Sequence, residues 1–149
     1  MWLWYARRGA FQLEAQILTD VQLYQMLESK IKAIRTLLVA AEQAMQKHPE
    51  KLRFQASNGY FGCMIEGRPH GIGRKTFNGS CFYESEWTNG HMNGAGACYW
   101  SAQKVRKGFF KEGKFDGLTV LISQGNTTCA LWQDGKEVRP LPFTPPSLS

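Results

Sequence analysis

The sequence predicts an α+β fold, in which an N-terminal α-helix precedes a twisted antiparallel β-meander of about three to four repeats. Two observations carry this prediction. Apolar residues follow a heptad pattern before residue 48, and a glycine pattern recurs about every 23 residues after residue 58. A chain of 149 residues is long enough for one domain with a modest core, or for a short repeat array with one added element.

We expect four segments along the chain. They are an N-terminal anchor or docking segment at 1–10, an α-helical segment at 11–48, a repeat sheet at 58–136 and a proline-rich tail at 137–149. The first segment places Trp2, Trp4 and Tyr5 beside two arginines, a composition suited to an interface or to packing on the chain's own sheet. The tail ends in RPLPFTPPSLS, which is too rich in proline to form a core of its own.

The helical segment is predicted from apolar residues that recur with a period of seven. Two heptad positions carry them: Ile17, Tyr24, Ile31, Leu38 and Met45 at the first, and Leu27, Ile34 and Ala41 at the second. Asp20 interrupts this seam. Thr19 followed by Gln22 resembles a capping box, so the regular helix either begins there or continues from residues 10–18. Pro49 ends it.

Two interpretations of the seam remain open from the sequence. The helix could lie on the chain's own repeat sheet, covering a face or capping an edge. Alternatively it could bind a protein partner or a second copy of the chain. In that case the partner-binding side chains are Ile17, Tyr24, Leu27, Ile31, Ile34 and Leu38.

The repeats are visible when four segments are aligned from Tyr60, Tyr83, Arg106 and Thr128, at spacings of 23, 23 and 22 residues. The eighth position of each segment is glycine: Gly67, Gly90, Gly113 and Gly135. The twelfth is glycine in three of them: Gly71, Gly94 and Gly117. The fifth position holds large apolar residues: Met64, Trp87, Phe110 and Trp132.

Glycines at these positions predict hairpins, because glycine adopts the positive φ that tight turns require. Asn78-Gly79 and Asn89-Gly90 are the strongest turn signals. Each repeat then supplies two short strands, giving seven or eight in all, with aromatic residues of one strand over glycines of the next. Gly73 and Gly96 are expected to serve this close packing. GRPHGIG lacks the lysine of a phosphate-binding loop and does not lead from a strand into a helix.

The pattern resembles the MORN repeat (membrane occupation and recognition nexus), whose units run approximately Y-x-G-x-W-x-x-G-x-x-H-G-x-G. This sequence departs from it at Met64, Ser85, Asn93, Arg106 and Thr119, and the fourth unit keeps little beyond its tryptophan and one glycine. The resemblance implies structural roles in the repeats for Tyr60, Gly62, Gly67, His70, Gly71, Gly73, Tyr83, Trp87, Gly90, Gly94, Gly96, Gly108, Phe110, Gly113, Gly117, Trp132 and Gly135.

The net charge is +6, and the excess of positive charge lies after residue 50. Such a surface could meet anionic phospholipid, nucleic acid or an acidic protein, or could simply be solvated. Nucleic acid is not expected, because the basic residues are not interleaved with an aromatic stacking platform. The candidate lipid-binding residues are Lys104, Arg106, Lys107, Lys111 and Lys114.

No catalytic or metal-binding constellation stands out. His48, His70 and His91 are predicted at a helix end, a repeat position and a turn, and no serine or cysteine stands in a nucleophile motif. The cysteines, at 63, 81, 98 and 129, form no CxxC pair, so we expect structural thiols and no zinc. We therefore expect neither enzymatic activity nor a cofactor.

Two functional hypotheses follow. MORN-bearing proteins occur in scaffolds, so the resemblance implies a structural subunit of a larger assembly that makes protein contacts through its helix and its sheet. The alternative is a peripheral membrane module that binds anionic phospholipids through a basic face. No apolar run approaches the length that spans a bilayer. We expect an intracellular protein, cytoplasmic or associated with the cytoskeleton, although MWLWYARRGAF would also fit the start of a mitochondrial presequence.

Overall fold

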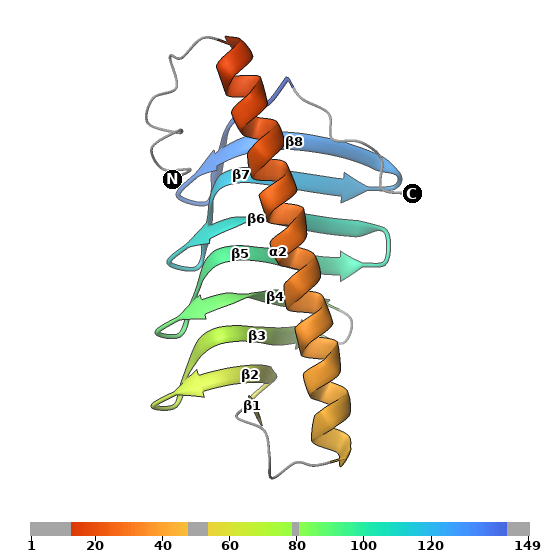
Figure 1. Ribbon diagram of the computed structural model, residues 1–149, viewed down its shortest axis with the longest axis vertical. Helices are drawn as coiled ribbons and strands as arrows, with labels where there is room; N and C mark the ends of the chain where they lie inside the picture. Colours follow the sequence, from red (N-terminus) through yellow and green to blue (C-terminus); the bar gives the residue numbers. More distant parts are fainter. Residues whose placement is uncertain (1–12, 48–53, 79–80, 143–149) are drawn as a thin grey trace.

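The computed structural model describes residues 13–47, 54–78 and 81–142. One 35-residue helix, α2 (Leu13–Lys47), lies across one face of an antiparallel sheet whose strand order follows the sequence (Figure 1). The strands are β1 (Phe54–Ser57), β2 (Tyr60–Ile65), β3 (Arg68–Asn78), β4 (Cys81–Thr88), β5 (His91–Ser101), β6 (Lys104–Lys111), β7 (Lys114–Ser123), β8 (Asn126–Gln133) and β9 (Lys136–Pro140). The predicted α+β meander is confirmed, and the described residues form nine strands in place of the seven or eight predicted.

The boundaries differ from the predicted segments at several points. The sheet begins at Phe54 and ends at Pro140, so the start of the predicted tail forms an edge strand. The helix runs through Thr19 without a break, because a helix already in progress leaves no free backbone N–H for a cap there. The anchor segment 1–10 and residues 143–149 of the tail lie outside the described residues.

The hairpin turns explain the first set of recurring glycines. In each of four turns, a non-glycine residue with φ of 49 to 53° precedes a glycine with φ of 76 to 88°. Two successive positive φ angles define the type I′ turn, whose twist matches that of the flanking strands. The four turns are Glu66-Gly67, Asn89-Gly90, Glu112-Gly113 and Asp134-Gly135. The predicted Asn89-Gly90 turn is thus confirmed, whereas Gly79 of the Asn78-Gly79 signal lies outside the described residues.

The second set of glycines marks irregular points in the longer strands. Gly71, Gly94 and Gly117 have φ angles of 99, 105 and 114°. Gly71 lies opposite Trp87, and Gly94 lies opposite Phe110. Each of these glycines lies in the second strand of a hairpin: β3, β5 or β7. Beside each glycine, the pairing register with the first strand of that hairpin shifts, because the second strand carries extra residues there. A β-bulge of this kind bends the strand and increases its twist.

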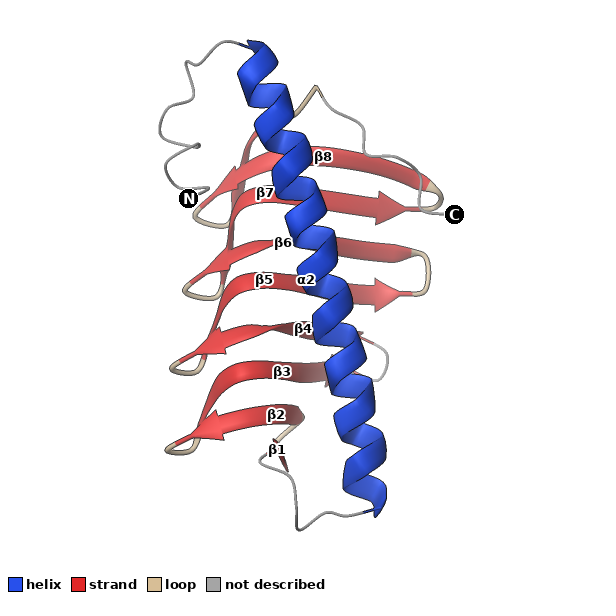
Figure 2. Ribbon diagram, in the orientation of Figure 1, coloured by secondary structure: helices blue, strands red, loops and turns tan. Residues whose placement is uncertain are grey.

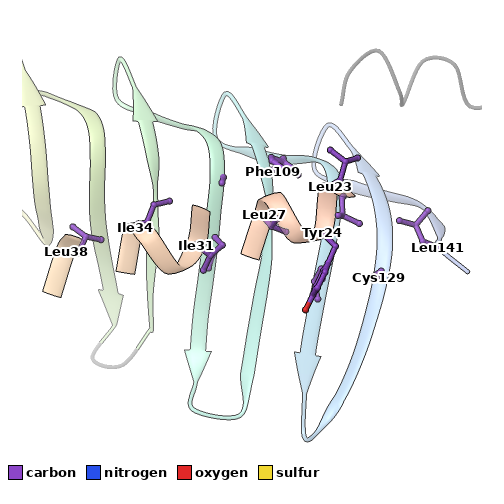
Figure 3. Close-up of a cluster of buried hydrophobic side chains, with 13 residues drawn as sticks. Leu23, Tyr24, Leu27, Ile31, Ile34, Leu38, Phe109, Cys129 and Leu141 are labelled. Carbon is purple, nitrogen blue, oxygen red and sulfur yellow. The ribbon is translucent and has the colours of Figure 1, made fainter. Parts of the chain in front are cut away.

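Apolar side chains from one stripe of α2 form the core with the sheet (Figure 3). Leu27 and Leu38 are fully buried. The helix contributes Leu23, Tyr24, Leu27, Ile31, Ile34 and Leu38, and the sheet side contributes Ala95, Ala97, Phe109, Leu118, Val120, Cys129 and Leu141. Burial of each large aliphatic side chain is worth roughly 1.5 to 3 kcal/mol.

This core corrects the prediction that the heptad seam binds a partner. The described side chains of that set, Tyr24, Leu27, Ile31, Ile34 and Leu38, are buried against the chain's own sheet. The physical reason is that one face of the sheet is apolar and the helix is tethered to it by a short connection, which gives the intramolecular contact a high effective concentration. The side chain of Ile17 lies outside the described residues.

Charged side chains hold the C-terminal half of α2 on the sheet. The carboxylate of Glu84, only 1% exposed, accepts hydrogen bonds from Arg35 at 2.7 Å and from Arg74 at 2.8 Å. Arg74 also donates to Glu42 of the helix at 2.7 Å. Burial lowers the pKa of Arg74, but the two carboxylates outweigh it and the net shift is upward. The network therefore sets the position of the helix along the strands.

Candidate interaction surface

The sheet face opposite α2 is organised around a row of small residues. Successive side chains of a strand point to opposite faces, so residues between the helix-facing positions lie on this second face. Figure 2 shows that the helix occupies only one side of the strands. The row crosses the strands in register and consists of Gly62, Gly73, Ser85, Gly96, Gly108, Thr119 and Ala130.

Aromatic rings occupy the space that these small residues leave. A Cβ atom at Gly73 would clash with the ring of Tyr60, and one at Gly96 would lie 2.9 Å from Phe110 Cε2. The indole N–H of Trp87 donates to the Gly73 carbonyl at 2.9 Å. The three rings are almost completely buried, although α2 lies on the other face of the sheet (Figure 2). Glycine at these positions is therefore needed for close approach, as the sequence predicts.

The rings also contact one another from repeat to repeat. Tyr60 and Trp87 form an edge-to-face pair with centroids 5.4 Å apart, and Phe110 and Phe115 lie 4.2 Å apart. Phe115 continues the row to Trp132 at 5.8 Å. Such pairs are worth about 0.5 to 1.5 kcal/mol beyond the area they bury.

The histidine position of the repeat supports the next turn. His70 Nδ1 accepts a hydrogen bond from the backbone N–H of Asn89 at 3.4 Å. Asp116, two repeats later at the same position, accepts from the N–H of Asp134 at 3.3 Å. These contacts join successive hairpins and show no arrangement suited to catalysis.

Backbone hydrogen bonds repeat the same connection in three successive repeats. The N–H of Gly90 donates to Pro69 O at 2.9 Å. The equivalent bonds in the next two repeats run from Gly113 to Met92 at 2.9 Å and from Gly135 to Phe115 at 2.8 Å. The repeat geometry therefore continues beyond the second unit to the turn at Asp134-Gly135.

A pocket of about 370 Å³ opens on this face, with a mostly apolar lining. Trp87 forms part of its wall, and the neighbouring Phe77 is 55% exposed. The repeat pattern does not single out Phe77 or Met92 as site residues, because neither occupies a position that the MORN motif specifies. The lining residues are Pro69, Lys75, Phe77, Trp87, Gly90, His91, Met92 and Gly113.

The predicted lipid-binding residues do not form one surface. Lys107 faces the helix and binds both carboxylate oxygens of Glu28, at 3.0 and 3.1 Å. Lys111 and Lys114 lie opposite one another beside a hairpin turn, at the far end of β6 from Lys104. The cluster is divided because alternate residues of a strand point to opposite faces.

Two of the five basic residues share the face opposite the helix. Lys104 lies over the ring of Trp100, with its Nζ 5.0 Å from the centroid. The guanidinium of Arg106 lies 4.6 Å from the centroid of Trp132. Burial lowers the pKa of Arg106, and nearby Glu137 partly opposes this effect. These two cations are held against aromatic rings and remain on the open face.

The described part of the chain contains no cluster of three or more His, Cys, Asp or Glu side chains that could hold a metal ion. All four cysteines are free thiols. Burial raises the pKa of Cys98 to about 11 and that of Cys129 to about 12, so both are protonated at neutral pH. The described residues also include no helix long and apolar enough to cross a membrane.

Comparison with known families agrees with the geometry of the repeats. The MORN-repeat family model matches residues 60–81 and 83–103. No curated protein matches the chain. The matched residues are the two units in which glycine, aromatic and turn positions are most complete, and the same turn geometry continues to Gly135. The chain therefore contains MORN repeats at residues 60–81 and 83–103.

Proposed function

We propose that this protein is a non-enzymatic scaffolding subunit that docks a protein partner on the sheet face opposite α2. MORN repeats are commonly modules of protein or membrane interaction. The observation that carries the proposal is the difference between the two faces. One is filled by the chain's own helix, whereas the other carries the apolar pocket beside the exposed Phe77. Contact through the outer side of α2 is the weaker candidate, since its apolar seam is already buried.

The test compares two exposed apolar residues on opposite sides of the molecule. Phe77→Ser removes an aromatic ring beside the pocket, and Leu37→Ser removes a side chain of α2 that is 45% exposed. Each variant is used to recover partners from native cells, next to the unaltered chain. We expect Phe77→Ser to lose a partner that Leu37→Ser retains. The opposite result would assign the contact to the helix and refute docking on the open face.

A second candidate function is binding to anionic phospholipid, favoured by Lys104 and Arg106 on the open face. Their replacement by glutamine should weaken the binding free energy to phosphatidylserine-containing vesicles by about 1 kcal/mol per charge, measured by vesicle sedimentation. Lys107→Gln is the matched control, because that side chain is paired with Glu28 and only 12% exposed. Binding should fall steeply with salt. Absence of sedimentation at low salt would eliminate this candidate.

We further propose that the assembly lies inside the cell, in the cytoplasm or on the cytoskeleton. The four free thiols support a reducing compartment, where disulfides are rare.

A further inference from the structure

Two hairpins of the repeat sheet differ at one equivalent position. In the β6–β7 hairpin Phe110 lies opposite Phe115, and the two rings are 4.2 Å apart. In the β4–β5 hairpin the equivalent pair is Trp87 opposite Met92. The ring that closes the later hairpin is therefore absent from the earlier one.

The apolar pocket lies at the place of this missing ring. Trp87 and Met92 both line it, together with Phe77. The turn glycines beside it leave the entrance open: a Cβ at Gly90 would meet no atom within 4 Å. Its volume of about 370 Å³ lies in the range of sites that accept a side chain or small ligand.

Lys75 is the one residue with a formal charge at neutral pH among the described residues that line the pocket. The titratable lining residues of the pocket are Lys75 and His91, and no carboxylate is among the described residues that line it. The ammonium of Lys75 donates one hydrogen bond, to the carbonyl of Asn58 at 2.9 Å, and has two further N–H groups. Acidic groups that flank an inserted ring would therefore be favoured over basic ones.

We propose that this pocket binds one aromatic side chain of an acidic polypeptide segment, in the place that Phe115 takes in the following repeat. This inference rests on the proposed docking function and names the anchor of the partner. The ring would stack between Trp87, Phe77 and the thioether of Met92, and sulfur–aromatic contacts of this kind are favourable. The flanking carboxylates would face Lys75 and His91.

The probe for this site is the pentapeptide acetyl-Glu-Glu-Trp-Glu-Glu-amide, added to the full-length protein. Its binding is followed by the NMR signal of the Trp87 indole N–H, which is held by the Gly73 carbonyl and adjoins the pocket. We expect a saturable shift of that signal. The same peptide with alanine in place of tryptophan, or with lysines in place of the glutamates, should bind at least tenfold more weakly. Equal binding by the three peptides would overturn the proposal.

Met92→Phe tests whether the pocket is the space of a missing ring. The new ring should fill it as Phe115 fills the next hairpin, and we expect the dissociation constant of the peptide to rise at least tenfold. Met26→Phe, on the exposed side of α2, is the matched control and should leave binding unchanged. Phe77→Ser provides a second variant at the pocket wall if Met92→Phe lowers the melting temperature. Undiminished binding by a folded pocket variant would refute the inference.

Failure of this inference and failure of the docking function give different results. If Met92→Phe still recovers a partner that Phe77→Ser loses, the open face docks proteins but the pocket does not receive the anchor. If neither variant changes recovery, the docking function itself fails.

Discussion

The two faces of the sheet are closed in different ways. The face under α2 is covered by a separate element, whose apolar stripe packs on side chains of β5 to β8 and on Ile72 of β3. The opposite face is covered by its own aromatic side chains, which lie on a row of small residues. Burial of the face under α2 requires a helix from elsewhere in the chain. Burial of the opposite face requires only side chains of neighbouring repeats. The face opposite α2 therefore has its small residues buried beneath the chain's own aromatic rings. The outer surface of those rings remains available for contact with another molecule.

The covered face itself has an apolar and a charged end. Near the start of α2, Leu23 and Leu27 belong to the same cluster as Val120 and Leu141, and hydrophobic burial supplies the stabilisation. Towards the end of α2, ion pairs around Glu84 join the apolar contacts of the buried Leu38. A buried carboxylate is costly unless every partner is in place, so these pairs select one position of the helix more than they add stability.

The largest effect is expected at the apolar end of the covered face. Leu27→Ala should lower the free energy of unfolding by about 2 to 5 kcal/mol, because it removes a fully buried side chain and leaves a cavity. Leu37→Ala, at an exposed position on the same helix, should change it by less than about 0.5 kcal/mol. Urea unfolding followed by circular dichroism measures both. Equal losses would show that the helix does not pack on the sheet through this stripe.

At the ion pairs around Glu84, removing a cation and removing the carboxylate should change stability by different amounts. Arg74→Leu should cost about 3 kcal/mol, because the buried carboxylate of Glu84 loses one of its two cations. Glu84→Leu should cost less, since Arg35 is about half exposed and can turn to water. The same unfolding measurement compares the two variants. A larger loss for Glu84→Leu would mean that the ion pairs are a main source of stability.

Within the sheet, the bulge glycines should matter more than ordinary surface positions. Gly94→Val should destabilise the protein by about 1 to 3 kcal/mol, because φ is 105° and the new side chain would collide with Glu86. Ala102→Val, in an exposed turn, is the control. Thermal melts that coincide for the two variants would contradict a structural role for the repeated glycine.

A smaller effect is expected from alkaline pH on the open face. Burial raises the pKa of Cys98 to about 11, above the ordinary thiol value of 9.0. The unfolded chain therefore loses this proton first, so the stabilisation is complete below about pH 9 and is lost as pH rises towards 11. The loss from this thiol should be about 1 kcal/mol near pH 10. Cys98→Ala should flatten the alkaline decline in unfolding free energy. An unchanged slope would place the titrating group elsewhere.

The sequence by itself determined the features that depend on local periodicity. A heptad repeat of apolar residues specifies a helix with one apolar face. Glycines 23 residues apart specify turns and close contacts with aromatic rings. The turn at Asn89-Gly90 and the packing at Gly73 and Gly96 could be predicted because each depends on a few neighbouring residues and on the next repeat.

Only the tertiary structure decided which surfaces meet. A heptad seam is equally suited to the chain's own sheet and to another chain, and the pairing of Arg35 with Glu84 joins residues 49 positions apart. The basic residues from 104 to 114 look like one patch in the sequence, but strand alternation and the pairing of Lys107 with Glu28 separate them. The pocket depends on Met92 standing where the next hairpin has Phe115. Periodicity defines the elements, whereas long-range packing and charge pairing determine how they combine, because those energies depend on distances that no local pattern contains.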